Sequence, residues 1–412
     1  MGKTIIILAT LDTKSAEVNF LKEIIETKKD HALIMDISMG IHRMNNLPIK
    51  PDITRERIME AGGKNWGDLP ENPLREEITP FMSRGAENII IELIANKKAH
   101  GVIALGGTQG TTICSEIMRT LPYGFPKVII STMASSDVSR FIDIKDIILF
   151  PSVSDILGLN PVLRKILSNA ASAICGMANN DIQIEIGEKP LIGIVNVGVT
   201  TPGTSKAIEI LMEEGLESIV FHGIGTGGRA MEHMIKDGII CAVFDYALIE
   251  VSNNIYNGLN DGGTERLTVS GKAGIPQVIC PGAIEILGLW NKKGEPLPEK
   301  FRGRKEIRHS SLITTVRFNK DEMLEIAKEV VRRLDYTKKD AIFMIPKGAF
   351  SLYSKKDMAF YDPEANEVFS DYIREKLPKN FEVVDVDADL TDEKFVRESI
   401  VKLLGLIESY KK

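Results

Sequence analysis

Residues 101–112 read GVIALGGTQGTT, and this stretch decides the fold. The small and aliphatic residues at 101–105 predict a buried strand, and Gly106, Gly107 and Gly110 predict a turn into a helix. A glycine has no Cβ, so the main chain around it can approach a bound group closely. Because the first N–H groups of a helix are unpaired, the stretch fits an anion-binding loop. It equally fits a plain strand–helix turn that needs glycine for packing.

Strands alternate with helices on both sides of this stretch. Continuous aliphatic runs predict strands at 3–10, 31–37 and 127–131, with helical spacing of apolar residues between them. Runs that are apolar throughout are typical of parallel strands covered on both faces. We therefore expect an α/β fold with mostly parallel sheets flanked by helices.

The chain is long enough for two such lobes. Its 412 residues favour two domains, and the polar segment 179–189 marks a change between them. After that segment the strand–loop–helix plan restarts, and GFPKVIIST at 124–132 resembles GIPQVICPG at 274–282. We predict two Rossmann-like lobes, an N-terminal one at 1–185 and a C-terminal one at 186–412.

One segment of the first lobe breaks the alternation. Residues 39–84 are rich in proline and contain Trp66, and helical spacing resumes at 86–98. Long irregular segments in compact domains are usually functional or disordered. We expect an irregular excursion in which Trp66 either reaches a ligand or, as the more ordinary alternative, anchors a packed surface loop.

Composition limits the classes of function. The chain is 43% hydrophobic and 26% charged with a formal net charge of −6, which argues against a nucleic-acid surface held by bulk positive charge. No apolar run approaches the roughly 20 residues of a membrane helix, and the N-terminal run at 5–10 is too short for a signal peptide. The four cysteines have no CxxC spacing and are expected to be buried thiols. These features predict a cytoplasmic protein without a membrane or nucleic-acid partner.

Three loops of the first lobe follow predicted strands and suit phosphate groups. They lie at 10–14, 106–112 and 131–137, and they are expected to converge because the carboxyl ends of parallel strands share one edge. Their N–H and hydroxyl groups can donate to phosphate oxygens, Lys14 can neutralise charge, and Asp12 could hold Mg²⁺ or a ribose hydroxyl. Alternatively, Asp12 and Lys14 lie at an ordinary solvent-exposed helix start.

A second glycine loop lies between a strand and a helix predicted in the C-terminal lobe. Residues Gly223–Gly228 match the G-x-G-x-x-G fingerprint of dinucleotide sites, and Asp245 stands where the ribose-binding acid is expected. Binding of NAD is therefore one interpretation of this loop. Another is that the glycines only permit tight packing.

A third interpretation of the same loop is a polar site for an anionic substrate or effector. His222, Arg229 and Glu232 would form it, with His222 as acid or base. These three residues are the catalytic candidates of the sequence.

Two other motifs give weaker signals. GVTTPGTS at 198–205 nearly matches a Walker A loop, but Thr204 stands where the lysine should be, so a P-loop NTPase is rejected. His309 with Ser310 and Ser311 could be catalytic, but a lone histidine beside an arginine is more often structural. No cluster of His, Cys, Asp or Glu has metal-ligand spacing, so no metal site built from protein ligands is predicted.

Taken together, the motifs resemble a known family. ATLDTK, LGGTQGT, STMASSD, GVTTP, VFHGIGTGGRAME and PKGAFSLYS follow one another along essentially the whole chain. In this combination the chain resembles the UPF0261 family, also called Tm-1-like ATP-binding proteins. The resemblance implies two Rossmann-like lobes, a homodimer, and ATP binding in the N-terminal lobe.

Carried over residue by residue, the resemblance implies where the nucleotide binds. The matched residues are Thr10, Asp12, Thr13 and Lys14 of the DTK motif and Gly106, Gly107, Thr108, Gly110 and Thr111 of the glycine loop. The strand-end argument adds Ser131, Thr132 and Ser135 of the third loop. The family often reads GGSGGT where Gln109 stands here, and HNP where His309, Ser310 and Ser311 stand, which weakens any catalytic role for His309.

The functional expectation is an ATP-binding two-lobe protein, with Mg²⁺ as a candidate companion ion. Two classes stay open: an enzyme acting on a small anionic metabolite in a cleft between the lobes, and a nucleotide sensor without turnover. Binding of NAD at Gly223–Gly228 is the lesser alternative.

Overall fold

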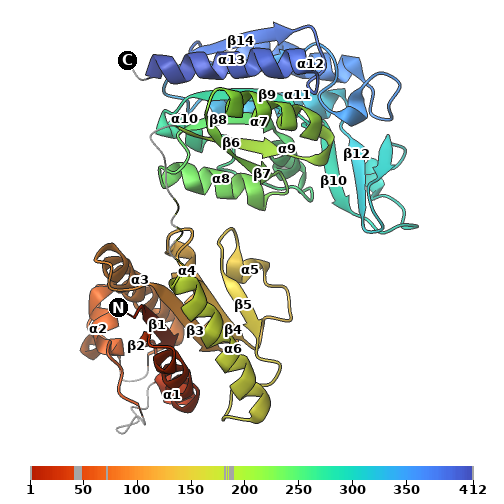
Figure 1. Ribbon diagram of the computed structural model, residues 1–412. Helices are drawn as coiled ribbons and strands as arrows, with labels where there is room; N and C mark the ends of the chain where they lie inside the picture. Colours follow the sequence, from red (N-terminus) through yellow and green to blue (C-terminus); the bar gives the residue numbers. More distant parts are fainter. Residues whose placement is uncertain are drawn as a thin grey trace. The chain divides into compact units, whose positions relative to one another are not determined.

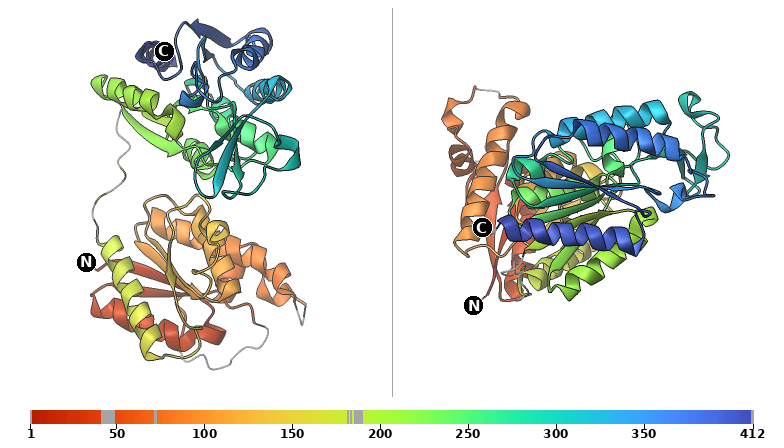
Figure 2. Two further views of the ribbon diagram at one scale, coloured as in Figure 1. Left: turned by 90° about the vertical axis from the view of Figure 1, so that its right-hand side faces the viewer. Right: turned by 90° about the horizontal axis from the view of Figure 1, so that it is seen from above.

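A computed structural model describes residues 2–40, 49–70, 73–180, 182, 184 and 190–410. It separates two compact units, Met1–Ile184 and Glu185–Lys412, so the division falls one residue before the predicted boundary. Each unit has its own sheet with helices on both faces (Figures 1 and 2). The expected α/β fold class, with mostly parallel sheets flanked by helices, is confirmed.

The N-terminal unit contains a five-stranded parallel sheet in the order β2-β1-β3-β4-β5 (Figure 1). Its strands are β1 (Thr4–Ala9), β2 (His31–Asp36), β3 (Gly101–Gly106), β4 (Lys127–Ser131) and β5 (Ile148–Pro151). Its helices are α1 (Leu11–Thr27), α2 (Arg55–Ala61), η1 (Trp66–Asp68), α3 (Arg75–Ala95), α4 (Thr108–Thr120), α5 (Ser139–Ile142) and α6 (Pro161–Ala178).

The apolar strands of this sheet are buried on both faces. Ile5 and Ile7 of β1 point to the face covered by α1 and α6, whereas Ile6 and Leu8 point to the face covered by α2, α3 and α4. This alternation explains why the run is apolar at every position, since successive side chains of a strand point to opposite faces.

The C-terminal unit repeats this plan. Its six parallel strands have the order β14-β13-β9-β8-β6-β7, which is the order of the first unit with one strand added at the edge. The strands are β6 (Leu191–Asn196), β7 (Glu217–His222), β8 (Ala242–Ala247), β9 (Gln277–Gly282), β13 (Ala341–Pro346) and β14 (Phe381–Val386). A separate antiparallel sheet contains β10 (Ile286–Trp290), β12 (Ile313–Arg317) and β11 (Glu306–Arg308).

Helices cover both faces of the second parallel sheet. Residues of α7 and α13 pack on one face, and residues of α8, α9, α11 and α12 pack on the other. The helices are η2 (Gly198–Thr200), α7 (Thr201–Glu213), α8 (Thr226–Lys236), α9 (Ile249–Tyr256), α10 (Val269–Ala273), η3 (Glu299–Phe301), α11 (Lys320–Leu334), η4 (Leu352–Ser354), α12 (Pro363–Lys376) and α13 (Glu393–Tyr410).

The segment 39–84 is more regular than its prolines indicate. It contains α2 and the start of α3, a helix that begins at Arg75 and continues through Pro80. A proline inside a helix costs about 3 kcal/mol, but burial of Ile78 and Met82 against the sheet opposes that cost. The parts 41–48 and 71–72 of the predicted excursion lie outside the described residues.

Two further findings concern the cysteines and the membrane-spanning potential of the helices. Cys114, Cys175 and Cys280 are buried as expected, whereas Cys241 is partly exposed. Among the helices of the described residues, none combines the length and apolarity that a bilayer crossing requires.

Candidate functional site

The loops that follow β1 and β3 lie next to each other because these two strands are neighbours in the sheet. The chain order reverses at this pair, since β2 lies on one side and β4 on the other. In open parallel sheets a ligand binds outside the carboxyl ends of the strands at such a switch point.

A cavity of about 320 Å³ lies at this switch point and joins the two loops. It is lined by Thr10, Asp12, Thr13, Lys14, Met39, Gly40, Arg75, Gly106, Gly107, Thr108, Gln109, Gly110 and Ile113. All four residues predicted from the first loop are present, together with four of the five predicted from the glycine loop. The fifth, Thr111, is buried beneath the loop, where its Oγ1 lies 2.6 Å from the Ser131 Oγ.

The first loop is itself the opening turn of α1, which begins at Leu11. A buried carboxylate holds this turn: Asp36 Oδ1, at the end of β2, accepts hydrogen bonds from the N–H groups of Leu11 (3.2 Å) and Ser38 (3.0 Å). Burial raises the pKa of Asp36, and the hydrogen bonds and the charge of Arg55 oppose that shift. Ser38 Oγ in turn accepts the N–H of Asp12 at 3.1 Å. The start of α1 is thus fixed from below, with Thr13 facing solvent.

The glycines of the second loop have different roles, and none of them has a positive φ. A Cβ at Gly106 would lie 2.8 Å from the Gly110 Cα, so close packing of β3 on the first turn of α4 requires glycine there. A Cβ at Gly107 would have Thr132 Oγ1 as its nearest contact at 3.9 Å, and one at Gly110 would lie 3.6 Å from the Leu105 carbonyl oxygen. Neither backbone angle nor packing therefore explains glycine at positions 107 and 110, both of which line the cavity.

The charges around the cavity favour an anion. Lys14 and Arg75 line it, Asp12 is the single acid among the lining residues that the structure describes, and the first turn of α4 contains no acidic side chain. The first-turn N–H groups of a helix have no partner within the helix and present partial positive charge. Lys14 Nζ donates to the Ile156 carbonyl oxygen at 2.5 Å, which holds this ammonium group at the cavity wall.

The third predicted loop, after β4, does not line this cavity. Ser131 is buried and its Oγ accepts the N–H of Met133 at 2.9 Å, so it organises the loop. The N–H of Thr132 donates to the Gly106 carbonyl oxygen at 3.3 Å, and Ser135 is exposed. These three residues therefore support or flank the glycine loop.

The glycine loop of the C-terminal unit binds an anion that the chain itself supplies. Glu250 Oε1, fully buried, accepts the N–H groups of Gly225 at 2.7 Å and Gly228 at 3.0 Å. A Cβ at Gly228 would lie 1.9 Å from Glu250 Oε2, so glycine is required for this contact. In a dinucleotide site these N–H groups would face the pyrophosphate. Glu250 takes the phosphate's place, so we do not carry the NAD interpretation further.

A buried arginine joins the acids behind this loop. Arg266 binds Asp245 through both terminal nitrogens, at 2.6 and 2.5 Å, and Glu250 through Nε at 2.9 Å. Its Nη1 also lies 3.4 Å from Glu232 Oε1, which accepts the N–H of Leu267 at 2.7 Å. The other oxygen, Glu232 Oε2, is buried and has no hydrogen-bond partner among the residues that the structure describes. Burial, more than any other effect, raises the pKa of Glu232 to about 7.

The three catalytic candidates do not form one exposed cluster. His222 is exposed at the end of the edge strand β7 and Arg229 is partly exposed on α8, whereas Glu232 is buried against Arg266. Asp245, the expected ribose acid, is occupied by the same arginine. His309 Nδ1 lies 3.4 Å from the Tyr353 hydroxyl at the surface. Within the described ranges, no group of three or more His, Cys, Asp or Glu side chains is placed to hold a metal ion.

Sequence reasoning missed several residues of the first cavity and its support, among them Gln109 and Ile113 of the lining. From outside the two loops, Met39, Gly40 and Arg75 also line it, and Asp36 fixes its floor. Asp36 had a signal, because it lies near the carboxyl end of a predicted strand, where parallel sheets bind ligands. Arg75 had none, since it lies in the proline-rich segment and reaches the cavity only through the start of α3.

Two family models cover this chain. The model described as "Uncharacterised protein family (UPF0261) N-terminal domain" matches residues 3–183, and the corresponding C-terminal domain model matches residues 189–407. A UPF0261 protein from Clostridium tetani is 36% identical over 99% of this chain and 100% of its own length. The ToMV resistance protein Tm-1(GCR237) from Solanum lycopersicum is 30% identical over 90% of this chain and 51% of its own length.

A solved structure of lower similarity is a putative UDP-N-acetylglucosamine 2-epimerase from Listeria monocytogenes. It is 12% identical, with a TM-score of 0.24, over 68% of this chain and 79% of that chain. A TM-score this low carries no argument about function.

Proposed function

The chain belongs to the UPF0261 family, and from that premise we propose that its N-terminal unit binds an adenine nucleotide, ATP, by the polyphosphate. The observation that carries the proposal is the cavity at the switch point, which joins the opening turn of α1 to the glycine loop before α4. Its volume of about 320 Å³ lies within the usual range for small-molecule sites.

The lining residues suit a polyphosphate in three ways. The N–H groups of the first turn of α4 can donate to phosphate oxygens, and the lack of a Cβ at Gly107 and Gly110, which line the cavity, lets those oxygens approach the main chain. Lys14 and Arg75 supply positive charge. Asp12 is the residue that would share a Mg²⁺ ion with the phosphates, since carboxylate and phosphate oxygens are the ligands that this ion prefers.

Isothermal titration of the full chain with MgATP tests the proposal. We expect saturable heat that weakens at least about tenfold in Lys14→Ala, because a charged contact to phosphate is lost. Lys22→Ala is the matched control, since Lys22 lies on the same helix but pairs with Glu26 on its exposed surface. Absence of saturable heat with the wild-type protein would contradict the proposal, as would equal affinities of the two variants.

Whether the bound nucleotide is consumed is a separate question, and release of ADP decides it. An enzyme releases ADP in the presence of its co-substrate, so the assay is run with a panel of small carboxylate and phosphate metabolites. A sensor binds ATP with the same affinity and releases no ADP with any member of the panel.

A further inference from the structure

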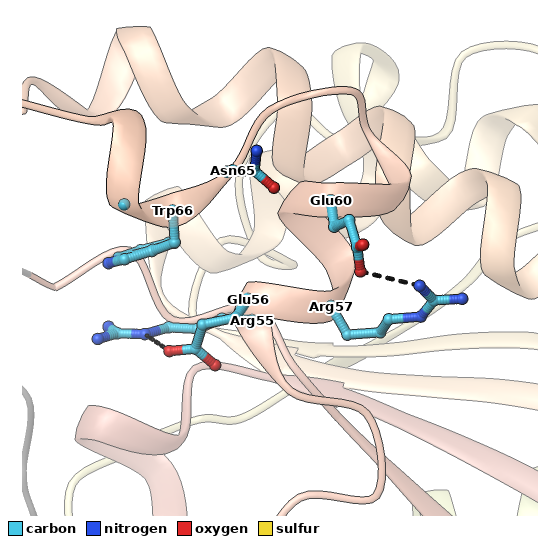
Figure 3. Close-up of a pocket in the computed structure, with 7 residues that line it drawn as sticks. Arg55, Glu56, Arg57, Glu60, Asn65 and Trp66 are labelled. Atoms are coloured by element: carbon cyan, nitrogen blue, oxygen red, sulfur yellow. Dashed lines mark hydrogen bonds and ion pairs between the residues drawn. The ribbon is translucent and has the colours of Figure 1, made fainter.

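Arg55 is an almost buried arginine in the segment 39–84, and its side chain is held on three sides. Only 7% of it is exposed, and its guanidinium carbon lies 4.2 Å from the centroid of the Trp66 ring (Figure 3). Its Nε donates to Glu56 Oε1 at 3.2 Å. Its Nη1 donates to the Gly40 carbonyl oxygen at 2.8 Å. A planar guanidinium stacked on an indole and bonded at its edge is a rigid arrangement.

Gly40 connects this arginine to the cavity of the N-terminal unit. It lines that cavity together with Asp12, and a Cβ on it would lie 2.4 Å from Asp12 Oδ2. The backbone at Gly40 therefore packs directly against the carboxylate of Asp12 on one side and is hydrogen-bonded to Arg55 on the other.

The charge of Arg55 also acts on the floor of the cavity. It lowers the pKa of Asp36, opposing the larger effect of burial, and so favours the carboxylate form that accepts the N–H groups of Leu11 and Ser38. Two separate contacts, one to Gly40 and one electrostatic to Asp36, thus lead from Arg55 to the cavity wall.

We propose that Arg55, stacked on Trp66, is a positioning residue of the phosphate cavity: it holds the backbone of Gly40 against Asp12 and so sets the shape of the wall that faces the ligand. This inference rests on the proposed function, because it concerns the same cavity. It gives Arg55 a role that the cavity lining does not assign, since Arg55 is not among the residues that line the cavity. Trp66 then reports on the cavity, because a change at Gly40 moves the charge that lies over its ring.

Arg57, two residues after Arg55 on the same helix α2, is a matched control. Arg57 is exposed and pairs with Glu60 at 2.9 Å, on the opposite side of the helix from the Trp66 stack in Figure 3. Both arginines line the same open hollow of about 690 Å³, so each variant removes an arginine from the border of that hollow. Only Arg55 bonds to Gly40.

The experiment compares the affinities of the full chain for MgATP and for inorganic tripolyphosphate. In Arg55→Met we expect both dissociation constants to rise about tenfold, as is usual when a charged hydrogen bond is lost. Arg57→Met should stay within about twofold of the wild type. Arg55→Lys should recover part of the affinity, because lysine keeps the charge over the ring without the planar fork.

The fluorescence of Trp66 gives a readout that a purely structural role would not move. The sequence has two tryptophans, so Trp290→Phe leaves Trp66 as the single emitter. Its emission should shift with the same midpoint as the calorimetric titration, and the shift should be lost in Arg55→Met and kept in Arg57→Met.

The outcomes separate this inference from the proposed function. If the wild type binds neither probe, the proposed function fails. If the wild type binds and Arg55→Met binds as tightly as Arg57→Met, the positioning role of Arg55 is overturned. If Arg55→Met does not fold, Trp66→Phe decides by calorimetry, because its weaker stacking should raise the dissociation constant about threefold, and an unchanged constant overturns the inference.

Discussion

Each unit contains a strand–glycine loop–helix segment, and the two segments differ in place and in occupant. The loop at Gly106–Gly110 follows β3 at the switch point and opens into a cavity. The loop at Gly223–Gly228 follows the edge strand β7, and its N–H groups are taken by the buried carboxylate of Glu250. The second loop matches the G-x-G-x-x-G fingerprint better, yet it is the first loop that lines a cavity. A glycine motif therefore indicates an anion at a helix start, and only the surrounding chain decides whether that anion is a ligand or a side chain.

The largest expected effect tests the internal anion site. In Arg266→Met the three acids Glu232, Asp245 and Glu250 lose their shared buried cation, which should lower the free energy of unfolding by about 3–5 kcal/mol. Urea denaturation followed by circular dichroism measures this change. Lys236→Met, which removes an exposed pair with Glu265, is the control and should change stability by less than about 1 kcal/mol. A similar small change in Arg266→Met would show that the cluster does not stabilise the loop.

The second prediction uses the pH dependence of the same cluster. The pKa of Glu232 is raised to about 7, against a usual value of 4.5, so the folded state keeps a proton that the unfolded state releases. The contribution of protonated Glu232 to stability is complete below pH 4.5 and is lost as the pH rises through 7. Glu232→Gln removes this loss. The difference in free energy of unfolding, variant minus wild type, should therefore increase by about 3 kcal/mol between pH 4.5 and pH 7. A constant difference between the two proteins would contradict the protonated carboxyl.

The third prediction concerns packing at the first loop. Gly106→Ala places a methyl group 2.8 Å from the Gly110 Cα, and such overpacking should cost about 1–3 kcal/mol of stability. Thermal unfolding measures it. Gly176→Ala is the control, because a Cβ at Gly176 meets no atom within 4 Å and lies in the helix α6. If both variants are equally stable, the close approach of β3 and α4 is not a constraint.

The smallest effect separates ligand binding from folding. Gly110→Ala has room for its methyl group and improves helix propensity, so stability should stay equal or rise by up to about 1 kcal/mol. Gly110 lines the cavity, so we expect the added methyl group to hinder the approach of phosphate to the main chain and to raise the dissociation constant for MgATP about tenfold. Isothermal titration calorimetry measures this dissociation constant, after thermal unfolding has shown that the variant is folded. Unchanged affinity would mean that the cavity does not bring the ligand to the main chain.

Much of the fold could be predicted from the sequence, because parallel strands buried on both faces leave a strong signal. The aliphatic run of β1 and the glycine loop after β3 were both found, and their neighbourhood follows from the shared edge of the sheet. The helix across Pro80 was missed, since local propensity opposes it and only burial of Ile78 and Met82 against the sheet supports it.

The residues of the candidate site that directly follow a strand could be predicted from the sequence. Thr10 to Lys14 and the glycine loop are of this kind, and they do line one cavity. Arg75 and Gly40 enter from distant segments, so their place depends on packing that no local pattern encodes. The binding of Glu250 to the N–H groups of the second loop could not be predicted either, because Glu250 lies 22 residues beyond Gly228 and its sequence context is that of an ordinary helical residue.

The strand order of the N-terminal unit has a consequence for synthesis on the ribosome. The central strand β1 pairs with β2 on one edge and with β3 on the other, and β3 begins at Gly101. At a translation rate of roughly 5–20 residues per second, β1 waits about 5–20 seconds for its second neighbour after it has been made. During that interval an aliphatic strand has one unpaired edge, which is the state that molecular chaperones recognise. The nascent chain, rather than the finished protein, is therefore where this fold is most exposed to aggregation.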